Sequence, residues 1–220
     1  MAEGLPEKRT ILFDVDGVLI HGWHAKEEKR RRWDENLQTD LGIDPAEFTA
    51  TFFPDIFPNQ VLTGRISLIS ALEIWLSERS YDVSPMALIS YWFAQDAVVN
   101  REMLPILEAL SEHGAVRLCL ATNQEHLRAA HLWQQVGFSS YFDDMFHAAR
   151  LGAIKPDPAF FHAVDKRLGR QITPPLLFDD NEDVIAAAGR HGWEAILFED
   201  ETSCKNHPSI AAYLAEITHR

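Results

Sequence analysis

Hydrophobic positions along the chain alternate between short, nearly uniform apolar runs and longer segments with helical spacing. The short runs suit parallel strands that are covered on both faces. They predict strands over Thr10–Asp14, Val116–Ala121, Met145–Ala148, Leu176–Asp179 and Ala195–Phe198. The amphipathic segments predict helices over Arg101–His113, Gln124–Val136, Pro158–Leu168, Asp183–His191 and Ser209–Ile217. This order of strands and helices indicates an α/β fold built on a doubly wound parallel sheet.

The alternation is interrupted once, between Gly17 and about Ala97. This stretch has no strand pattern and is divided by glycines and prolines. Helical spacing predicts four helices, over His24–Leu41, Pro45–Phe53, Ile66–Arg79 and Ser84–Gln95. We therefore expect an inserted all-helical cap domain over residues 18–97. Residues 1–17 and 98–220 are then expected to form the α/β core.

Composition limits the partners that such a protein can have. The 220 residues include 20 Lys and Arg and 33 Asp and Glu, which gives a formal net charge of −13. An acidic surface repels nucleic acid and anionic lipid, so we expect neither as a partner. A small phosphorylated ligand remains compatible, because one lysine and one metal ion can reverse the field locally.

Cysteine usage and hydropathy bear on the compartment. Cys119 and Cys204 are the two cysteines, too few for a disulfide framework. The opening residues MAEGLPEKRT contain no apolar stretch of signal-peptide length, and no apolar run is long enough to span a membrane. We expect a cytoplasmic protein.

Two carboxylates stand at the end of the first predicted strand. Asp14 and Asp16 are two positions apart, and Gly17 allows a sharp turn immediately after them. Open α/β sheets bind their ligands at this end of the strands. Close carboxylates repel each other, so either one is protonated or a cation lies between them. Taken alone, the motif is equally compatible with a strand end capped by turn-forming residues.

The ends of the second and fourth predicted strands are polar as well. Thr122 and Asn123 can cap the following helix, and the same helix start can bind an anion. Asp179 and Asp180 open an Asp-Asp-Asn-Glu-Asp run whose oxygens suit Mg²⁺. An acidic helix start favoured by the helix dipole is the alternative, and it explains Asp183 better than Asp179.

One lysine stands just before a predicted helix. Lys155 is followed by Pro156 and Asp157, which suit the first turn of that helix. Beside strand ends that carry carboxylates, Lys155 is a candidate for a fixed positive charge. Together these residues favour phosphoryl transfer through a covalent aspartyl intermediate.

The four motifs, in this order, resemble those of the haloacid dehalogenase (HAD) superfamily, in its phosphatase branch with a helical cap after the first motif. The motifs are Asp14–Leu19, Thr122-Asn123, Lys155–Asp157 and Asp179-Asp180. The resemblance extends from Thr10 to about Phe198. Within that branch, the run Asp179–Phe198, the stretch Gly64–Ser67 and the cap length look most like sugar-phosphate phosphatases. Glucose-1-phosphate phosphatases are the nearest group.

The resemblance implies a role for each motif residue. Asp14 would attack phosphorus, and Asp16 would protonate the leaving oxygen and later deprotonate the attacking water. The phosphoryl group would be held by Thr122, the backbone at Asn123, and Lys155. The implied metal is Mg²⁺, with ligands from Asp14, the backbone carbonyl of Asp16, Asp179 and Asp180.

The implied activity is a Mg²⁺-dependent phosphatase acting on a small phosphorylated metabolite, with a sugar phosphate as one candidate. Asp16 argues against a dehalogenase, because halide departure needs no proton. A phosphomutase of the same superfamily and a catalytically weak phospho-ligand-binding member stay open as alternatives. The fourth motif often has an Asn where this chain has Val184, and Asp183 is a possible substitute.

The predicted cap carries several side chains that could face a substrate. Most of its tryptophans, at positions 23, 33, 75 and 92, are expected in the cap core. We interpret His21 and His24 as exposed-loop residues in the first instance. The run Lys29–Arg32 is expected on a solvated helical face.

Overall fold

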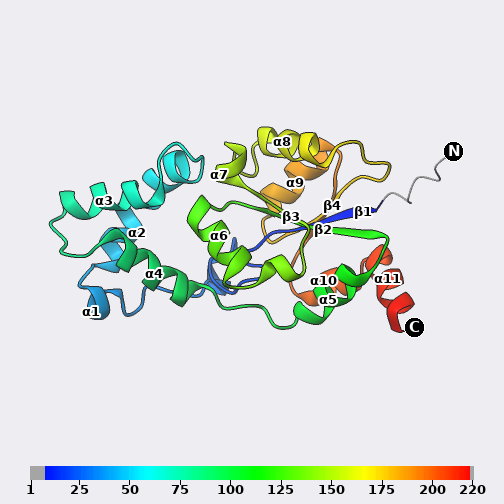
Figure 1. The fold of residues 1–220 in the computed structure, drawn as a ribbon, viewed down its shortest axis with the longest axis horizontal. Helices are drawn as coiled ribbons and strands as arrows, with labels where there is room; N and C mark the ends of the chain where they lie inside the picture. Colours follow the sequence, from blue (N-terminus) through cyan, green and yellow to red (C-terminus); the bar gives the residue numbers. More distant parts are fainter. Residues whose placement is uncertain (1–7, 219–220) are drawn as a thin grey trace.

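The computed structural model describes residues 8–218 (Figure 1). A single five-stranded parallel sheet lies at its centre, in the strand order β3-β2-β1-β4-β5. The strands are β1 (Arg9–Phe13), β2 (Val116–Thr122), β3 (Asp144–His147), β4 (Leu176–Asp179) and β5 (Glu194–Leu197). Each end lies within one residue of its predicted position, so the strand predictions are confirmed.

Two layers of helices cover the sheet, because successive strand residues point to opposite faces. Phe13 belongs to a buried cluster with α5 (Leu104–Glu112), α6 (His126–Gln134), α10 (Glu201–Lys205) and α11 (Pro208–Thr218). Leu12 belongs to a second cluster with α8 (Pro158–Leu168) and α9 (Glu182–His191). Figure 1 shows α8 and α9 above the sheet and α5, α10 and α11 below it. The doubly wound fold is confirmed.

The residues after β1 form a helical insert with its own apolar core. Its helices are α1 (Leu37–Leu41), α2 (Pro45–Thr51), α3 (Leu68–Glu78) and α4 (Pro85–Asp96), with a π-helical turn over Phe57–Val61. Phe48, Phe52 and Trp75 are fully buried in a cluster separate from those of the sheet. In Figure 1 the insert lies beyond one end of the sheet.

The predicted helix over His24–Leu41 is wrong. The structure has only a 3₁₀ turn over Glu27–Lys29 before α1. Residues 27–32 are all exposed, so this segment offers no apolar face that could stabilise a helix. Arg30 instead folds back, and its Nε donates to the His24 carbonyl at 2.8 Å. The segment is an ordered loop.

Two chain crossings connect the insert to the sheet domain, and they pair with each other. Ile20 and Val99 form an antiparallel bridge. The N–H of His21 donates to the Val98 carbonyl at 2.7 Å, and that of Asn100 donates to the Leu19 carbonyl at 2.8 Å. No helix within residues 8–218 has the length and apolar character needed to cross a membrane.

Candidate active site

The central strand delivers Asp14 to the carboxyl edge of the sheet. Phe13 pairs with Leu120 of β2 on one side and with Phe178 of β4 on the other. The next residue, Asp14, donates its N–H to the Phe178 carbonyl at 2.9 Å and then leaves the sheet. Strand register therefore brings Asp14 beside Asp179, the residue that ends β4.

Immediately after Asp16 the chain turns at Gly17, which has a φ of +79°. A Cβ atom at this position would lie 2.6 Å from Cγ of Asp180. Both the backbone conformation and the space therefore require glycine. The turn presses the first motif directly against the Asp180 carboxylate.

We expect Gly17→Ala to destabilise the fold and to weaken Mg²⁺ binding at least about tenfold. A non-glycine residue at positive φ costs about 1–3 kcal/mol, and the added methyl group must also displace Asp180. Gly42→Ala is the matched control, since Gly42 has a φ of +72° but nothing within 4 Å of its Cβ position. Urea unfolding and calorimetric Mg²⁺ titration measure both effects. Equal Mg²⁺ affinities for the two variants would contradict the role given to Gly17.

The ammonium group of Lys155 lies at the centre of the buried polar cluster. Its Nζ contacts the Ala121 carbonyl at 2.7 Å, Asp179 Oδ2 at 2.6 Å and Asp14 Oδ1 at 3.0 Å. Three N–H donors thus meet three acceptors. Burial opposes the positive charge, but the carboxylates of Asp14 and Asp179 outweigh it and raise the pKa of Lys155. Lys155 is therefore a permanent cation at neutral pH.

Asn123 fixes Lys155 through the backbone. Its side-chain nitrogen donates to the Lys155 carbonyl at 2.9 Å, and its side-chain oxygen accepts from the Lys155 N–H at 2.8 Å. Thr122, one residue earlier, is buried at the end of β2. The second motif therefore positions the lysine of the third motif.

Three buried carboxylates, those of Asp14, Asp179 and Asp180, form the one group within residues 8–218 that could hold a metal ion. One oxygen from each lies within 4.8 Å of the others. The buried Oδ1 of Asp180 has no hydrogen-bond partner among the described residues. One lysine cannot neutralise three carboxylates. A hard divalent cation fits this all-oxygen donor set.

The electrostatics of these carboxylates point the same way. Burial and the neighbouring Asp14 charge raise the pKa of Asp179 to about 7 and that of Asp180 to about 6, against the opposing effect of Lys155. A carboxylate with a raised pKa holds a proton in place of a missing cation. Protons and a divalent cation should therefore compete for this cluster.

Without a divalent cation, the thermal midpoint is expected to fall as the pH rises. A carboxylate whose pKa is raised on folding stabilises the fold fully below pH about 4 and loses that contribution through pH about 6–7. Mg²⁺ bound at this cluster would pair with the ionised carboxylates, so its stabilising effect is expected to grow over the same range and exceed about 3 °C at pH about 8. Thermal unfolding with EDTA and with Mg²⁺, at both ends of this range, provides the measurement. A Mg²⁺ effect independent of pH would contradict the assignment.

His24 is buried at this cluster, so the expectation of an exposed loop histidine is wrong. Its Nδ1 accepts the Lys26 N–H at 2.9 Å and lies 3.0 Å from Asp180 Oδ2. Burial, together with Lys29 and Lys26, lowers the pKa of His24, so the ring is neutral at neutral pH. Two acceptor atoms thus face each other, which is a further reason for a proton or a cation at Asp180.

Asp16 lies beside this cluster and has its own partners. Gln124 Nε2 donates to Oδ2 of Asp16, and Arg128 Nη2 lies 3.3 Å from its Oδ1. Burial and the nearby Asp14 raise the pKa of Asp16, while Arg128 and Gln124 oppose the shift. A carboxyl group with a raised pKa can carry a proton to a leaving group.

Val184 and Asp183, the two residues in question at the fourth motif, both lie outside the carboxylate cluster. Val184 is buried in the apolar cluster under α9. Asp183 is exposed, and its N–H donates to the Oδ1 of Asn181, which caps α9. Asp183 therefore does not join the carboxylate cluster.

The chain is similar in sequence to known hydrolases and phosphatases. A model of the haloacid dehalogenase-like hydrolase family matches residues 8–192. The GMP/IMP nucleotidase YrfG of Escherichia coli (strain K12) is 26% identical over 211 residues, covering 93% of this chain and 91% of that protein. The fructose-1-phosphate phosphatase YqaB of the same strain is 31% identical over 189 residues, covering 84% and 94%.

Solved structures show the same fold. The HAD family enzyme BT-2542 of Bacteroides thetaiotaomicron, crystallised with magnesium and inorganic phosphate, matches with a TM-score of 0.71. It is 19% identical, and the match covers 86% of this chain and 93% of that one. With the family model matching most of its length, the chain belongs to the haloacid dehalogenase-like hydrolases.

Proposed function

We propose that this hydrolase is a Mg²⁺-dependent phosphatase that cleaves small phosphorylated metabolites through an aspartyl-phosphate on Asp14. The observation that carries the proposal is the placement of Asp14. It contacts the buried cation Lys155 and shares a cluster with two further buried carboxylates. Asp16, two residues on, is held separately by Gln124 and Arg128. Asp14 and Asp16 thus have different electrostatic environments, which supports the roles of nucleophile and proton donor proposed for them.

The residues divide the reaction between them. Asp14 attacks phosphorus as the bond to the leaving oxygen breaks, and Asp16 gives its proton to that oxygen. In the second half Asp16 takes a proton from water, which attacks the aspartyl-phosphate and releases Asp14 and inorganic phosphate. Lys155 offsets negative charge on Asp14 and on the phosphoryl oxygens, and Thr122 at the end of β2 and the backbone at Asn123 are proposed to hold the phosphoryl group.

A divalent cation fits the cluster, for the reasons given above. The side chains of Asp14, Asp179 and Asp180, with the Asp16 carbonyl, are the residues proposed to hold Mg²⁺. When bound, the ion supplies positive charge that lets an anionic nucleophile approach an anionic phosphate. Phosphate-containing crystals of the related BT-2542 also contain magnesium.

The proposal assigns residues 1–17 and 98–220 to the catalytic core and residues 18–97 to a cap domain. A separate apolar cluster in the insert and the paired crossings at Ile20 and Val99 support this division. Residues 1–7 and 219–220 lie outside the described part of the chain. Both cysteines are buried thiols, which fits the cytoplasm to which the proposal assigns the protein.

The substrate is proposed at the level of a class. By their names, one relative acts on nucleotides and another on a sugar phosphate, and both substrates are monoesters of small hydroxylated metabolites. Nucleoside monophosphates and sugar phosphates are therefore the first compounds to compare.

Phosphate release from both groups, and from para-nitrophenyl phosphate, tests the proposal. We expect turnover that requires Mg²⁺ and is abolished by EDTA. Turnover that needs a bisphosphate activator and returns an isomer would indicate the phosphomutase alternative. Thermal stabilisation by a phosphorylated compound without any turnover would indicate the binding protein.

A further inference from the structure

Arg128 joins the sheet domain to the insert, and no sequence motif indicated it. The residue lies in the first turn of α6, and its side chain is buried. Its Nη2 lies 3.3 Å from Asp16 Oδ1, 3.0 Å from Asp96 Oδ2 and 3.2 Å from the Asp96 carbonyl. One guanidinium nitrogen thus contacts the proposed proton donor and a residue of the insert.

Asp96 stands where the insert ends. It is the last residue of α4 and is buried. Its Oδ2 also accepts a hydrogen bond from Trp92 Nε1 at 3.1 Å. On its other side, a Cβ atom on Gly22 would lie 2.5 Å from Oδ1. Asp96 is therefore in contact with both chain crossings and with the core of the insert.

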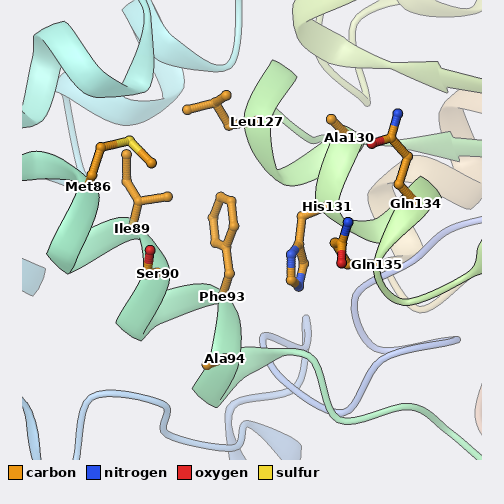
Figure 2. Close-up of a pocket in the computed structure, with 10 residues that line it drawn as sticks. All are labelled: Met86, Ile89, Ser90, Phe93, Ala94, Leu127, Ala130, His131, Gln134 and Gln135. Carbon is orange, nitrogen blue, oxygen red and sulfur yellow. The ribbon is translucent and has the colours of Figure 1, made fainter.

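Aromatic contacts lie between the neighbouring surfaces of α4 and α6. The Phe93 ring of α4 lies 5.7 Å from Cζ of Arg128 and 5.2 Å from the His131 ring of α6. Figure 2 shows Phe93 and His131 side by side between the two helices, at the edge of an open groove of about 430 Å³. The contact of Arg128 with Asp96 is a polar connection between the insert and the sheet domain next to Asp16.

We propose that Arg128 and Asp96 are positioning residues for Asp16, through which the insert sets the orientation of the proton-donating carboxyl. This inference rests on the proposed function. Asp16 is held at one oxygen by Gln124 and at the other by Arg128, and Arg128 is itself held by Asp96. A displacement of α4 moves Asp96, and with it the guanidinium that holds Asp16.

Two polar atoms of this network make no hydrogen bond to the described residues. Arg128 Nη1 and Asp96 Oδ1 are both buried and lack hydrogen-bond partners within residues 8–218.

Leaving-group dependence separates a positioning role from a structural one. An alkoxide leaving group needs the proton of Asp16, whereas para-nitrophenolate leaves readily without it. When formation of the aspartyl-phosphate is irreversible, kcat/KM depends on the steps up to and including departure of the leaving group. It does not depend on the later hydrolysis of the intermediate. Misplacing Asp16 should therefore lower kcat/KM for an alkyl phosphate more than for para-nitrophenyl phosphate.

Arg128→Lys and Asp96→Asn test the inference, with Arg79→Lys as the matched control. Arg79 has similar neighbours, the Trp75 ring and the carboxylates of Glu47 and Glu78, but lies on α3's C-terminal end. We expect the alkyl-to-aryl ratio of kcat/KM to fall about 10- to 100-fold in both test variants. The ratio should stay at the wild-type value in the control.

A double substitution completes the test. If Arg128 acts through Asp16, adding Arg128→Lys to Asp16→Asn should leave the ratio where Asp16→Asn alone puts it. Equal losses on both substrates, or further loss in the double variant, would overturn the inference. If Arg128→Lys does not fold, the alkyl-to-aryl ratio of kcat/KM for Asp96→Asn tests the inference instead. Wild-type protein inactive on both substrates would instead refute the proposed function, and this inference with it.

Discussion

Asp14→Asn is expected to abolish phosphate release from every substrate, by at least about 10³-fold, while leaving the protein folded. An amide oxygen is a poor nucleophile, so no aspartyl-phosphate can form in the variant. Asp179 is not available to replace it, since one of its oxygens accepts from Lys155 and the other from the Asn181 N–H. The loss should be in kcat, with phosphate analogues still bound in the presence of Mg²⁺.

The same variant should be no less stable than the wild type when divalent cations are removed. Three buried carboxylates share one lysine, so replacing one with a neutral amide relieves repulsion between Asp14 and its neighbours. Asp183→Asn is the control, because Asp183 ends the acidic run that begins at Asp179 but is exposed and outside the cluster. Phosphate-release assays and thermal unfolding in EDTA measure both quantities. Turnover by Asp14→Asn above about one tenth of the wild-type rate would contradict the covalent mechanism.

Lys155→Met is expected to remove both activity and stability. The side chain is buried between Asp14 and Asp179, and removing one partner of a buried ion pair costs about 3–5 kcal/mol. Loss of the fixed cation also leaves the phosphoryl oxygens and Asp14 without their charge partner. We expect at least about a 10³-fold loss of turnover.

Mg²⁺ should restore part of the stability lost in Lys155→Met but little of the activity. The ion can offset the carboxylates, whereas it cannot supply the lysine N–H groups directed at Asp14 and Asp179. Lys166→Met, an exposed substitution on α8, provides the control in urea unfolding with and without Mg²⁺. A cation-free Lys155→Met protein as stable as this control would show that Lys155 does not hold the cluster together. The two variants thus have opposite expected effects on cation-free stability.

The sheet could be predicted from the sequence because its strands are buried on both faces. A strand such as Leu176–Asp179 is apolar at every position until its final carboxylate, so its type and its end are both visible. Asp14 and Asp179 could be singled out because they stand at the ends of buried strands, and Lys155 because it closely precedes a helix that begins with a proline.

The residues that hold Asp16 could not be found in this way. Arg128 lies 112 positions from Asp16, in a helix turn whose sequence reads as an ordinary surface turn. His24 meets Asp180 only because residues 24 and 25 fold over the end of β4, where the Ala25 N–H donates to Asp180 at 2.7 Å. Whether such polar side chains are buried depends on the docking of distant segments, which local periodicity does not contain. Gln124 gave one weak signal, as the residue directly after the second motif.

Because the two crossings pair with each other, the insert leaves and rejoins the sheet domain at one backbone junction. The chain leaves the sheet domain and returns to it at adjacent positions, with Leu19 and Asn100 joined by a backbone hydrogen bond. The Asn100 side chain also donates to the Val18 carbonyl at 2.9 Å, which fixes the junction from the sheet side. Lengthening, shortening or exchanging the helices beyond this junction therefore need not change the spacing between β1 and β2. An exchanged insert would still have to keep the contact of Asp96 with Arg128, through which the insert reaches Asp16.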